Sequence, residues 1–155
     1  MRYWLYKVNR RGGPAGWSGD WEEDLFASAK SRRWGGHEAS LSPEVHRALD
    51  EEISVGDVIV AYQTDRKVVV GYARVESVTG RPRARGIVLQ PIERVDPPLK
   101  IHEHKHGTPL ASSNAVKGPV MLRELQRSEM EALLLLTKTP KRVLKGRAST
   151  SGFRP

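Results

Sequence analysis

The amino-acid sequence predicts an α+β fold, in which a small bent β-barrel of about five or six strands is flanked by about three helices. Two runs rich in Val, Ile and Tyr, Val58–Tyr62 and Val68–Val75, flank the polar break 63–67, a pattern typical of consecutive antiparallel strands. Both faces of the second run are largely apolar, so we expect the hairpin to be buried on both sides. Gly71 within this run indicates a bulge, a sharp bend or close backbone packing. A bent hairpin of this kind favours a closed barrel over a flat sheet.

Further stretches with the composition of strands complete the predicted sheet. The first, Arg2–Val8, is dense in strand formers, and we expect its Trp4 and Leu5 to belong to the core. The others are Gly86–Val95 and Val120–Leu125.

The helices are predicted from their capping residues and from apolar side chains at helical spacing. An acidic first turn follows the first cap, and a proline at the first helical position follows the second. The predicted helices span residues 21–30, 43–49 and 129–136, capped by Asp20, Ser42 and Ser128.

The net charge of +8 is unevenly distributed along the chain. Residues 138–155 carry six Lys or Arg and no carboxylate, which leaves +2 for residues 1–137. We therefore predict a folded domain over 1–137 and a basic, disordered tail over 138–155, which adds salt-sensitive attraction to phosphates. The sequence has no cysteine, no secretory signal and no apolar run approaching the ~20 residues that a membrane helix needs. We expect a cytoplasmic monomer with no cofactor and no membrane partner.

Catalytic residue sets are poorly represented, so an enzyme is the weaker interpretation. The sequence contains no cysteine nucleophile, no Gly-x-Ser-x-Gly elbow and no phosphate-cradling glycine loop with its lysine. The alternative rests on His102, His104 and His106, because alternate histidines of a strand project from one face and can bind zinc or copper. These residues belong to the segment Lys100–Asn114, which has no clear period and is predicted to be an irregular surface segment.

Three of the four tryptophans, Trp17, Trp21 and Trp34, fall within a predicted loop–helix–loop. The segment Ser31–Gly36 is predicted to be a loop that presents Trp34 beside two glycines. One interpretation is an aromatic recess that stacks a planar ring, which is worth about 1–3 kcal/mol per stacked base. The other is that these indoles are ordinary core residues that cover the end of the barrel.

These residues also resemble the EVE domain family, whose relatives include the YTH domains within the PUA-like superfamily. The similarity is carried by the order and spacing of several short motifs over about residues 1–137. The motifs are Tyr3-Trp4-Leu5-Tyr6-Lys7, Val55-Gly56-Asp57-Val58 leading into Ala61-Tyr62, Gly71-Tyr72-Ala73-Arg74-Val75, and the closing stretch from Val120 to Leu133.

The resemblance implies a PUA-like bent barrel with a pocket that reads a modified base. In YTH domains that base is methylated adenine in RNA, and EVE-type members are linked to modified bases that include methylated cytosine in DNA. By position, Asn9 corresponds to a polar contact to the base edge, Trp34 to the tryptophan that opens the pocket loop, and Tyr62 to a pocket wall. The sequence after Trp34 lacks the Arg-Asn-Tyr common in EVE proteins, so we expect the edge of the ligand that is read here to differ.

The sequence therefore predicts a nucleic-acid-binding module that captures a methylated base, flipped or single-stranded, in an aromatic pocket. A metal-dependent or nucleotide-processing enzyme that uses the histidines, and a protein-interaction barrel with a filled pocket, stay open as alternatives. The predicted base-binding residues are Lys7, Asn9, Trp17, Trp21, Trp34, Gly35 and Tyr62. The predicted phosphate contacts are Arg10, Arg11, Arg32, Arg33, Arg81, Arg83 and Arg85.

Overall fold

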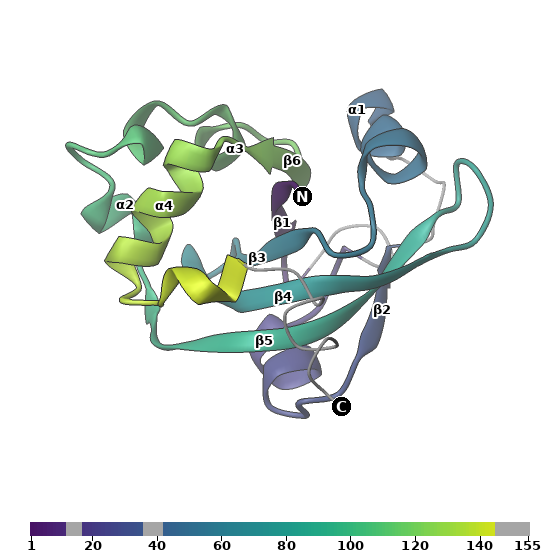
Figure 1. Ribbon diagram of the computed structural model, residues 1–155, viewed down its shortest axis with the longest axis horizontal. Coiled ribbons are helices and arrows are strands. Elements are labelled where there is room, and N and C mark those ends of the chain that lie inside the picture. The colour runs from purple at the N-terminus through teal and green to yellow at the C-terminus, as the bar shows by residue number, and fades with distance from the viewer. Residues whose placement is uncertain (12–16, 36–41, 145–155) are drawn as a thin grey trace.

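The computed structural model describes residues 1–11, 17–35 and 42–144, which are organised around one six-stranded sheet curled into a half-barrel (Figure 1). The strands lie in the order β2-β5-β4-β3-β1-β6, so β2 and β6 form the two edges. Strand β1 runs parallel to β3, and all other neighbouring strands are antiparallel. The predicted α+β fold with a bent, barrel-like sheet is confirmed, and the described strands form a half-barrel with two edges instead of the closed barrel that the bent hairpin favours. The strands are β1 (Tyr3–Val8), β2 (Arg32–Gly35), β3 (Val58–Gln63), β4 (Val68–Thr79), β5 (Gly86–Leu99) and β6 (Leu122–Leu125).

The central hairpin of β3 and β4 is confirmed, and it is buried on both faces over most of its length. The pairing of β4 with β5 shifts register between Val69 and Gly71. A Cβ atom added at Gly71 would lie 2.5 Å from Cζ of Phe26 and 2.7 Å from the carbonyl oxygen of Glu93. Gly71 therefore provides both the bulge and the close packing that the sequence predicts.

A buried carboxylate fixes the start of β3 against the beginning of the chain. Asp57 is 2% exposed and accepts hydrogen bonds from the backbone N–H groups of Arg2 and Ser54, at 3.0 and 2.9 Å. Its Oδ2 also accepts the indole N–H of Trp4 at 3.0 Å. Trp4 is thus a core residue with a satisfied donor, as expected for a structural tryptophan.

The two faces of the sheet carry separate cores. Trp4, Tyr6 and Val8 of β1 pack on one face, against η1, α1 and η2. Tyr3 and Leu5 pack on the other face, which α2, α3 and α4 cover (Figure 1). The helical segments are η1 (Glu22–Phe26), α1 (Pro43–Arg47), η2 (Ala48–Glu52), α2 (Ile101–His104), η3 (Pro109–Ser112), α3 (Asn114–Lys117), α4 (Arg127–Leu136) and η4 (Lys141–Leu144). Among the described residues, no helix is long and apolar enough to cross a bilayer.

The caps agree with the sequence in two of three cases. The carboxylate of Asp20 accepts two backbone N–H groups of the first turn of η1, and the side chain of Ser42 caps α1. Helix α4 begins at Arg127, earlier than predicted, because Gln126 and Glu129 form its capping box instead of Ser128.

Three local predictions are wrong. The segment predicted to be a loop at 31–36 contains the edge strand β2, and β5 continues past Val95 to Leu99. The segment 100–114 contains α2 and η3, whose Ile101 and Leu110 are fully buried. Helical turns of four residues bury too few side chains to produce a recognisable apolar period, so no sequence pattern predicts them.

The folded body extends beyond residue 137, where the sequence predicts it to end. Val143 and Leu144 of η4 are each 8% exposed. The Arg74 guanidinium, which is buried in the sheet, donates to the carbonyl oxygens of Val143 and Gly56 at 2.7 and 3.0 Å. The part of the predicted tail from 145 to 155 lies outside the described residues.

Two truncations test this boundary. Removing residues 145–155 keeps every contact of η4 given above, so this shorter truncation serves as the reference for the longer one. Removing residues 141–155 should cost about 3–5 kcal/mol, since two apolar side chains leave the core and Arg74 loses a carbonyl acceptor. Urea denaturation of both truncated chains measures the difference, and equal midpoints would show that η4 contributes nothing to the fold.

Candidate functional site

Four aromatic rings meet on the face of the sheet that η1 covers. Tyr6 stacks on Trp17 with 4.5 Å between ring centroids, and it meets Trp21 and Trp34 edge-on at 5.1 and 6.2 Å. Trp21 and Trp34 lie 4.1 Å apart. We call these four residues the aromatic cluster. None of the four is more than 3% exposed, and burial raises the pKa of the Tyr6 hydroxyl well above its ordinary value, so Tyr6 stays neutral.

The ends of β1 and β3 position the two indoles that precede and begin η1. Asn9, directly after β1, forms an isolated parallel bridge with Ser18, next to Trp17. Gln63, at the end of β3, is fully buried. Its side chain accepts the backbone N–H of Trp21 at 3.0 Å and donates to the carbonyl oxygen of Gly19 at 2.9 Å. The cluster therefore rests on the carboxyl ends of two parallel neighbouring strands.

The indole N–H groups of the chain differ in their partners. Trp4 donates to Asp57, and Trp21 donates to the carbonyl oxygen of Tyr62 at 3.2 Å. The N–H groups of Trp17 and Trp34 are buried and have no hydrogen-bond partner among the described residues. A buried donor without a partner costs about 1–3 kcal/mol, so these two groups are suited to receive an acceptor from outside the protein.

The aromatic cluster is closed in this structure, in contrast to the open recess that the sequence predicts. Two rings that sandwich a third must stand about 7–8 Å apart, because carbon atoms pack at about 3.5–4.0 Å. The 4.1 Å between Trp21 and Trp34 leaves no such gap. The ring of Trp34 also has the Arg32 guanidinium 5.1 Å from its centroid, and that guanidinium pairs with Asp24 at 3.1 Å.

Five of the seven predicted base-binding residues come together at this cluster. They are Asn9, Trp17, Trp21, Trp34 and Gly35. A Cβ added at Gly35 would lie 3.7 Å from the hydroxyl of Tyr6. The carboxamide oxygen of Asn9 accepts the backbone N–H of Arg11 at 2.8 Å, in the turn that follows β1.

The other two predicted base-binding residues, Lys7 and Tyr62, are placed on the opposite face of the sheet. They pair in register across β1 and β3, and Tyr62 belongs to the core beneath α2 and α4. Lys7 donates through Nζ to the carbonyl oxygen of Gly118. Side chains alternate between faces along a strand, so Lys7 cannot share a face with its neighbour Tyr6.

The predicted phosphate contacts form separate groups. Arg33 on β2 lies against Gly80 and Gly86, at the ends of the loop that connects β4 and β5, so it joins the basic residues of that loop. Those residues are Arg81, Arg83 and Arg85. Arg10 and Arg11 are exposed beside the end of β1, and Arg10 lies 3.5 Å from Asp20. Arg32 covers Trp34, as described above.

The histidines lack the arrangement that the metal alternative requires. His102 and His104 lie in the helix α2 instead of a strand, so alternate side chains do not share one face. The described residues contain no group of three or more His, Cys, Asp or Glu that could hold a metal ion. His102 instead forms a 3.1 Å hydrogen bond with the hydroxyl of Tyr62.

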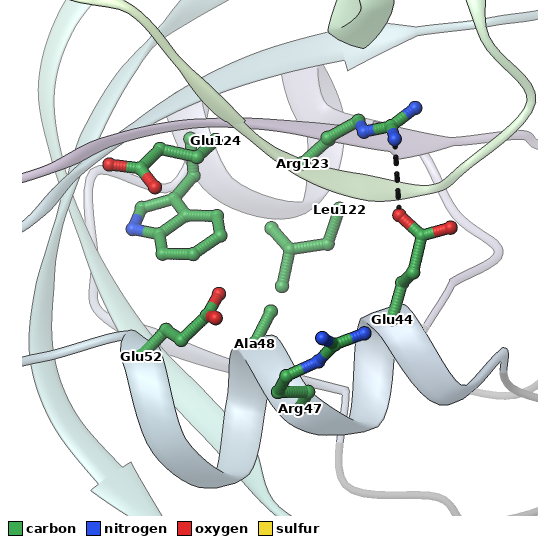
Figure 2. Close-up of a pocket in the computed structure, with 8 residues that line it drawn as sticks. Glu44, Arg47, Ala48, Glu52, Leu122, Arg123 and Glu124 are labelled. Carbon is green, nitrogen blue, oxygen red and sulfur yellow. Dashed lines mark ion pairs between the residues drawn. The ribbon is translucent and has the colours of Figure 1, made fainter.

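A pocket of about 270 Å³ lies elsewhere, between the α1–η2 segment and β6 (Figure 2). Figure 2 shows Arg47, Ala48 and Glu52 on the helical side and Leu122 on the strand side. Two of the lining carboxylates are paired, Glu44 with Arg123 at 3.2 Å and Glu124 with Arg2 at 3.7 Å. The lining includes Trp4, whose donor is satisfied, and none of the predicted base-binding residues. This pocket is therefore not the predicted recess.

Sequence reasoning missed Tyr6 and Gln63. Tyr6 contacts all three indoles, and its signal was available, because alternation along β1 places it on the same face as Trp4. Gln63 falls in the polar break that the sequence reads as a turn. Its role depends on a contact with Gly19 that no local pattern reveals.

Comparison with known proteins finds relatives in structure and none in sequence. No protein-family model matches the chain, and no curated protein matches it. The chain is similar to human THYN1 in complex with DNA that contains 5-methylcytosine, with a TM-score of 0.69 and 13% identity over 90% of this chain and 99% of that one. It is also similar to Atu2648 from Agrobacterium tumefaciens, with a TM-score of 0.68 and 15% identity over 91% and 96% of the two chains.

A more distant similarity links the chain to the YTH domain of the Zygosaccharomyces rouxii MRB1 protein in complex with N6-methyladenosine RNA. The TM-score is 0.54 and the identity is 12%, over 88% of this chain and 86% of that one. At sequence identities this low, the structural similarity establishes the fold and nothing more. The chain therefore has the PUA-like fold of the THYN1-type EVE domains and of their YTH relatives, as the sequence resemblance predicts.

Proposed function

We propose that this protein is a nucleic-acid-binding module that recognises a methylated base through its aromatic cluster. The observation that carries the proposal is the pair of buried indole N–H groups of Trp17 and Trp34, which have no hydrogen-bond partner within residues 1–11, 17–35 and 42–144. A nucleobase offers what this site lacks, since it has a planar face for stacking and acceptor atoms along its edge. The fold shared with proteins solved with 5-methylcytosine DNA and N6-methyladenosine RNA supports the same ligand class.

The base can reach the cluster by replacing the Arg32 guanidinium on the ring of Trp34. The side chain of Arg32 is 50% exposed, so its cation–π contact and its ion pair with Asp24 are worth only about 0.5–1 kcal/mol each. A stacked base contributes about 1–3 kcal/mol, and a hydrogen bond to an unpartnered donor recovers about 1–3 kcal/mol more. The exchange therefore favours the base, and it releases Arg32 toward a phosphate.

The strand that bears Trp34 suits such an exchange. Strand β2 is an edge of the sheet and pairs only with β5 among the described strands, so it can move without disturbing the central hairpin. Extruding a base from a duplex costs a few kcal/mol, so a single-stranded or already flipped base binds more easily. Arg10 and Arg11, which are exposed beside the end of β1, supply the phosphate contacts that set the register of the strand, and Arg33 adds a contact at the β4–β5 loop.

A second candidate, a protein-interaction barrel with a filled core, is favoured by the 4.1 Å contact between Trp21 and Trp34. In that function the cluster serves only as packing, and any attraction to nucleic acid comes from the basic surface. The two candidates differ in whether methylation of one base changes the affinity.

A binding panel separates them. We expect the chain to bind single-stranded oligonucleotides with one 5-methylcytosine or one N6-methyladenosine more tightly than the matched unmethylated strands, and to keep that preference as salt rises. A variant that ends at Leu144 loses Lys145, Arg147 and Arg154, so its affinity should fall at low salt while the preference is unchanged. Equal affinity for every methylated and unmethylated pair would contradict the proposed function.

A further inference from the structure

The side chains on the opposite face from the aromatic cluster, at the same end of β1 and β3, form a second set of polar groups. Lys7 and Tyr62 are register partners there, and the Tyr62 hydroxyl lies 3.1 Å from Nε2 of His102 on α2. Lys105 is three residues after His102, so the two share one side of that helical turn. Lys67 belongs to the turn that connects β3 and β4.

This set of groups is cationic, and its lysines have no carboxylate partner in the described part of the chain. Among the described residues, Lys7, Lys67 and Lys105 make no ion pair within 4.0 Å. The carboxylates nearest in sequence to these lysines accept hydrogen bonds from other groups or are exposed to solvent. Asp65, in the same turn as Lys67, accepts from Gln63 and from the backbone of Arg10, and Glu103 on α2 is exposed.

The pKa values of His102 and Lys7 are shifted in the direction expected for positive charges that lie close together. The pKa of His102 is lowered from its ordinary value. Burial is the largest cause, and the positive charges of Lys105, Lys67 and Lys7 add to it. Burial, followed by the charge of Arg123, lowers the pKa of Lys7 to about 8. Each group would hold its proton more tightly if a negative charge lay among them.

We propose that Lys67, Lys105, His102 and the Tyr62 hydroxyl, with Lys7 behind them, form a phosphate-binding site on the helical face of the sheet. Lys67 and Lys105 supply the charge, while Tyr62 and His102 supply hydrogen-bond donors that the sheet and α2 hold in place. This site is separate from the arginines that flank the aromatic cluster.

The phosphate fits the backbone of a nucleic acid that crosses the end of the sheet, and this part of the inference rests on the proposed function. Tyr62 connects the two faces of the sheet. Its carbonyl oxygen accepts the indole N–H of Trp21, and its hydroxyl is hydrogen-bonded to His102. Layers packed on a sheet lie about 10 Å from it, so a strand reaches from one site to the other within a few nucleotides.

The site can be tested by following the His102 ring resonances of the full chain by NMR during titration with dimethyl phosphate, a phosphodiester that does not titrate near neutral pH. We expect saturable shifts at constant ionic strength. Binding should be about tenfold tighter near pH 5.5 than near pH 8, because protonation of His102 and Lys7 adds charge as the pH falls.

The variant Lys67→Gln/Lys105→Gln should lose most of this affinity. Lys30→Gln/Arg47→Gln removes the same charge from exposed side chains on the other face of the sheet and should retain it.

A second arm uses single-stranded oligothymidylate to identify the source of the phosphate. Displacement of dimethyl phosphate from His102 by the oligonucleotide supports the backbone assignment. Shifts with dimethyl phosphate but not with the oligonucleotide would support a phosphate site and rule out a nucleic-acid backbone as its ligand. The proposed function is tested independently of this result, by the preference for methylated strands in the binding panel. No shift of His102 with either probe, or equal shifts in the two double variants, would overturn the site.

Discussion

Replacing Trp34 with alanine is expected to abolish the preference for a methylated oligonucleotide and to lower the free energy of unfolding by about 3–5 kcal/mol. The indole is 3% exposed, contacts Trp21 at 4.1 Å between centroids and lies beside Tyr6, so its removal leaves a cavity in the core. Both effects follow from one position, because the proposed ligand surface and the core of this face are built from the same ring. Urea denaturation and oligonucleotide binding measure the two effects.

A milder pair of variants separates binding from folding. Trp34→Phe keeps an aromatic ring and removes an N–H group that has no partner in the described part of the chain, whereas Trp21→Phe removes one that donates to the carbonyl oxygen of Tyr62. We expect Trp21→Phe to be the more destabilising change, since it leaves a buried carbonyl oxygen without its donor. We expect Trp34→Phe to lose more of the methyl preference. Retention of the full preference by Trp34→Phe would assign that ring to packing alone.

Replacing Gly71 with alanine is expected to destabilise the protein by about 3 kcal/mol or more. The added Cβ would lie 2.5 Å from a ring carbon of Phe26 and 2.7 Å from the carbonyl oxygen of Glu93. The ring can rotate or shift, but the carbonyl belongs to the paired strand β5 and cannot move without breaking the register. The cost should appear as a lower denaturation midpoint in urea.

Gly107→Ala is the matched control for this change. Gly107 has a φ of +76° and no atom within 4 Å of an added Cβ, so alanine there incurs only the conformational cost of about 1–2 kcal/mol. Phe26→Leu combined with Gly71→Ala should restore part of the loss, because the leucine relieves one of the two contacts. If Gly71→Ala were as stable as Gly107→Ala, the packing of Gly71 against Phe26 and Glu93 would not be as tight as these distances indicate.

The fold was largely predictable because its strongest signals are local. The runs that became β3 and β4, and the aromatic start that became β1, are long apolar stretches whose burial follows from composition alone. Strand β2 was not predictable, because Arg32 and Arg33 carry charges and Gly35 reads as a turn. Its pairing with β5 is decided by the tertiary structure.

The candidate site was predictable in its residue types and not in its geometry. Trp17, Trp21 and Trp34 are conspicuous in the sequence, and they do meet. That they close on one another depends on how η1 and β2 pack against β1, which no spacing along the chain encodes. Position in the family pattern predicts that Lys7 and Tyr62 line the pocket, whereas strand alternation places them on the other face.

The indole N–H resonances of the four tryptophans provide the most direct measurement of the central proposal. In a titration of the labelled full chain with a methylated oligonucleotide, the resonances of Trp17 and Trp34 should shift as their N–H groups gain acceptors. The resonance of Trp4, whose N–H is bonded to Asp57, should stay in place, and the unmethylated strand should produce smaller changes at Trp17 and Trp34. Binding of the methylated strand that leaves the Trp17 and Trp34 resonances unmoved would contradict recognition by the aromatic cluster.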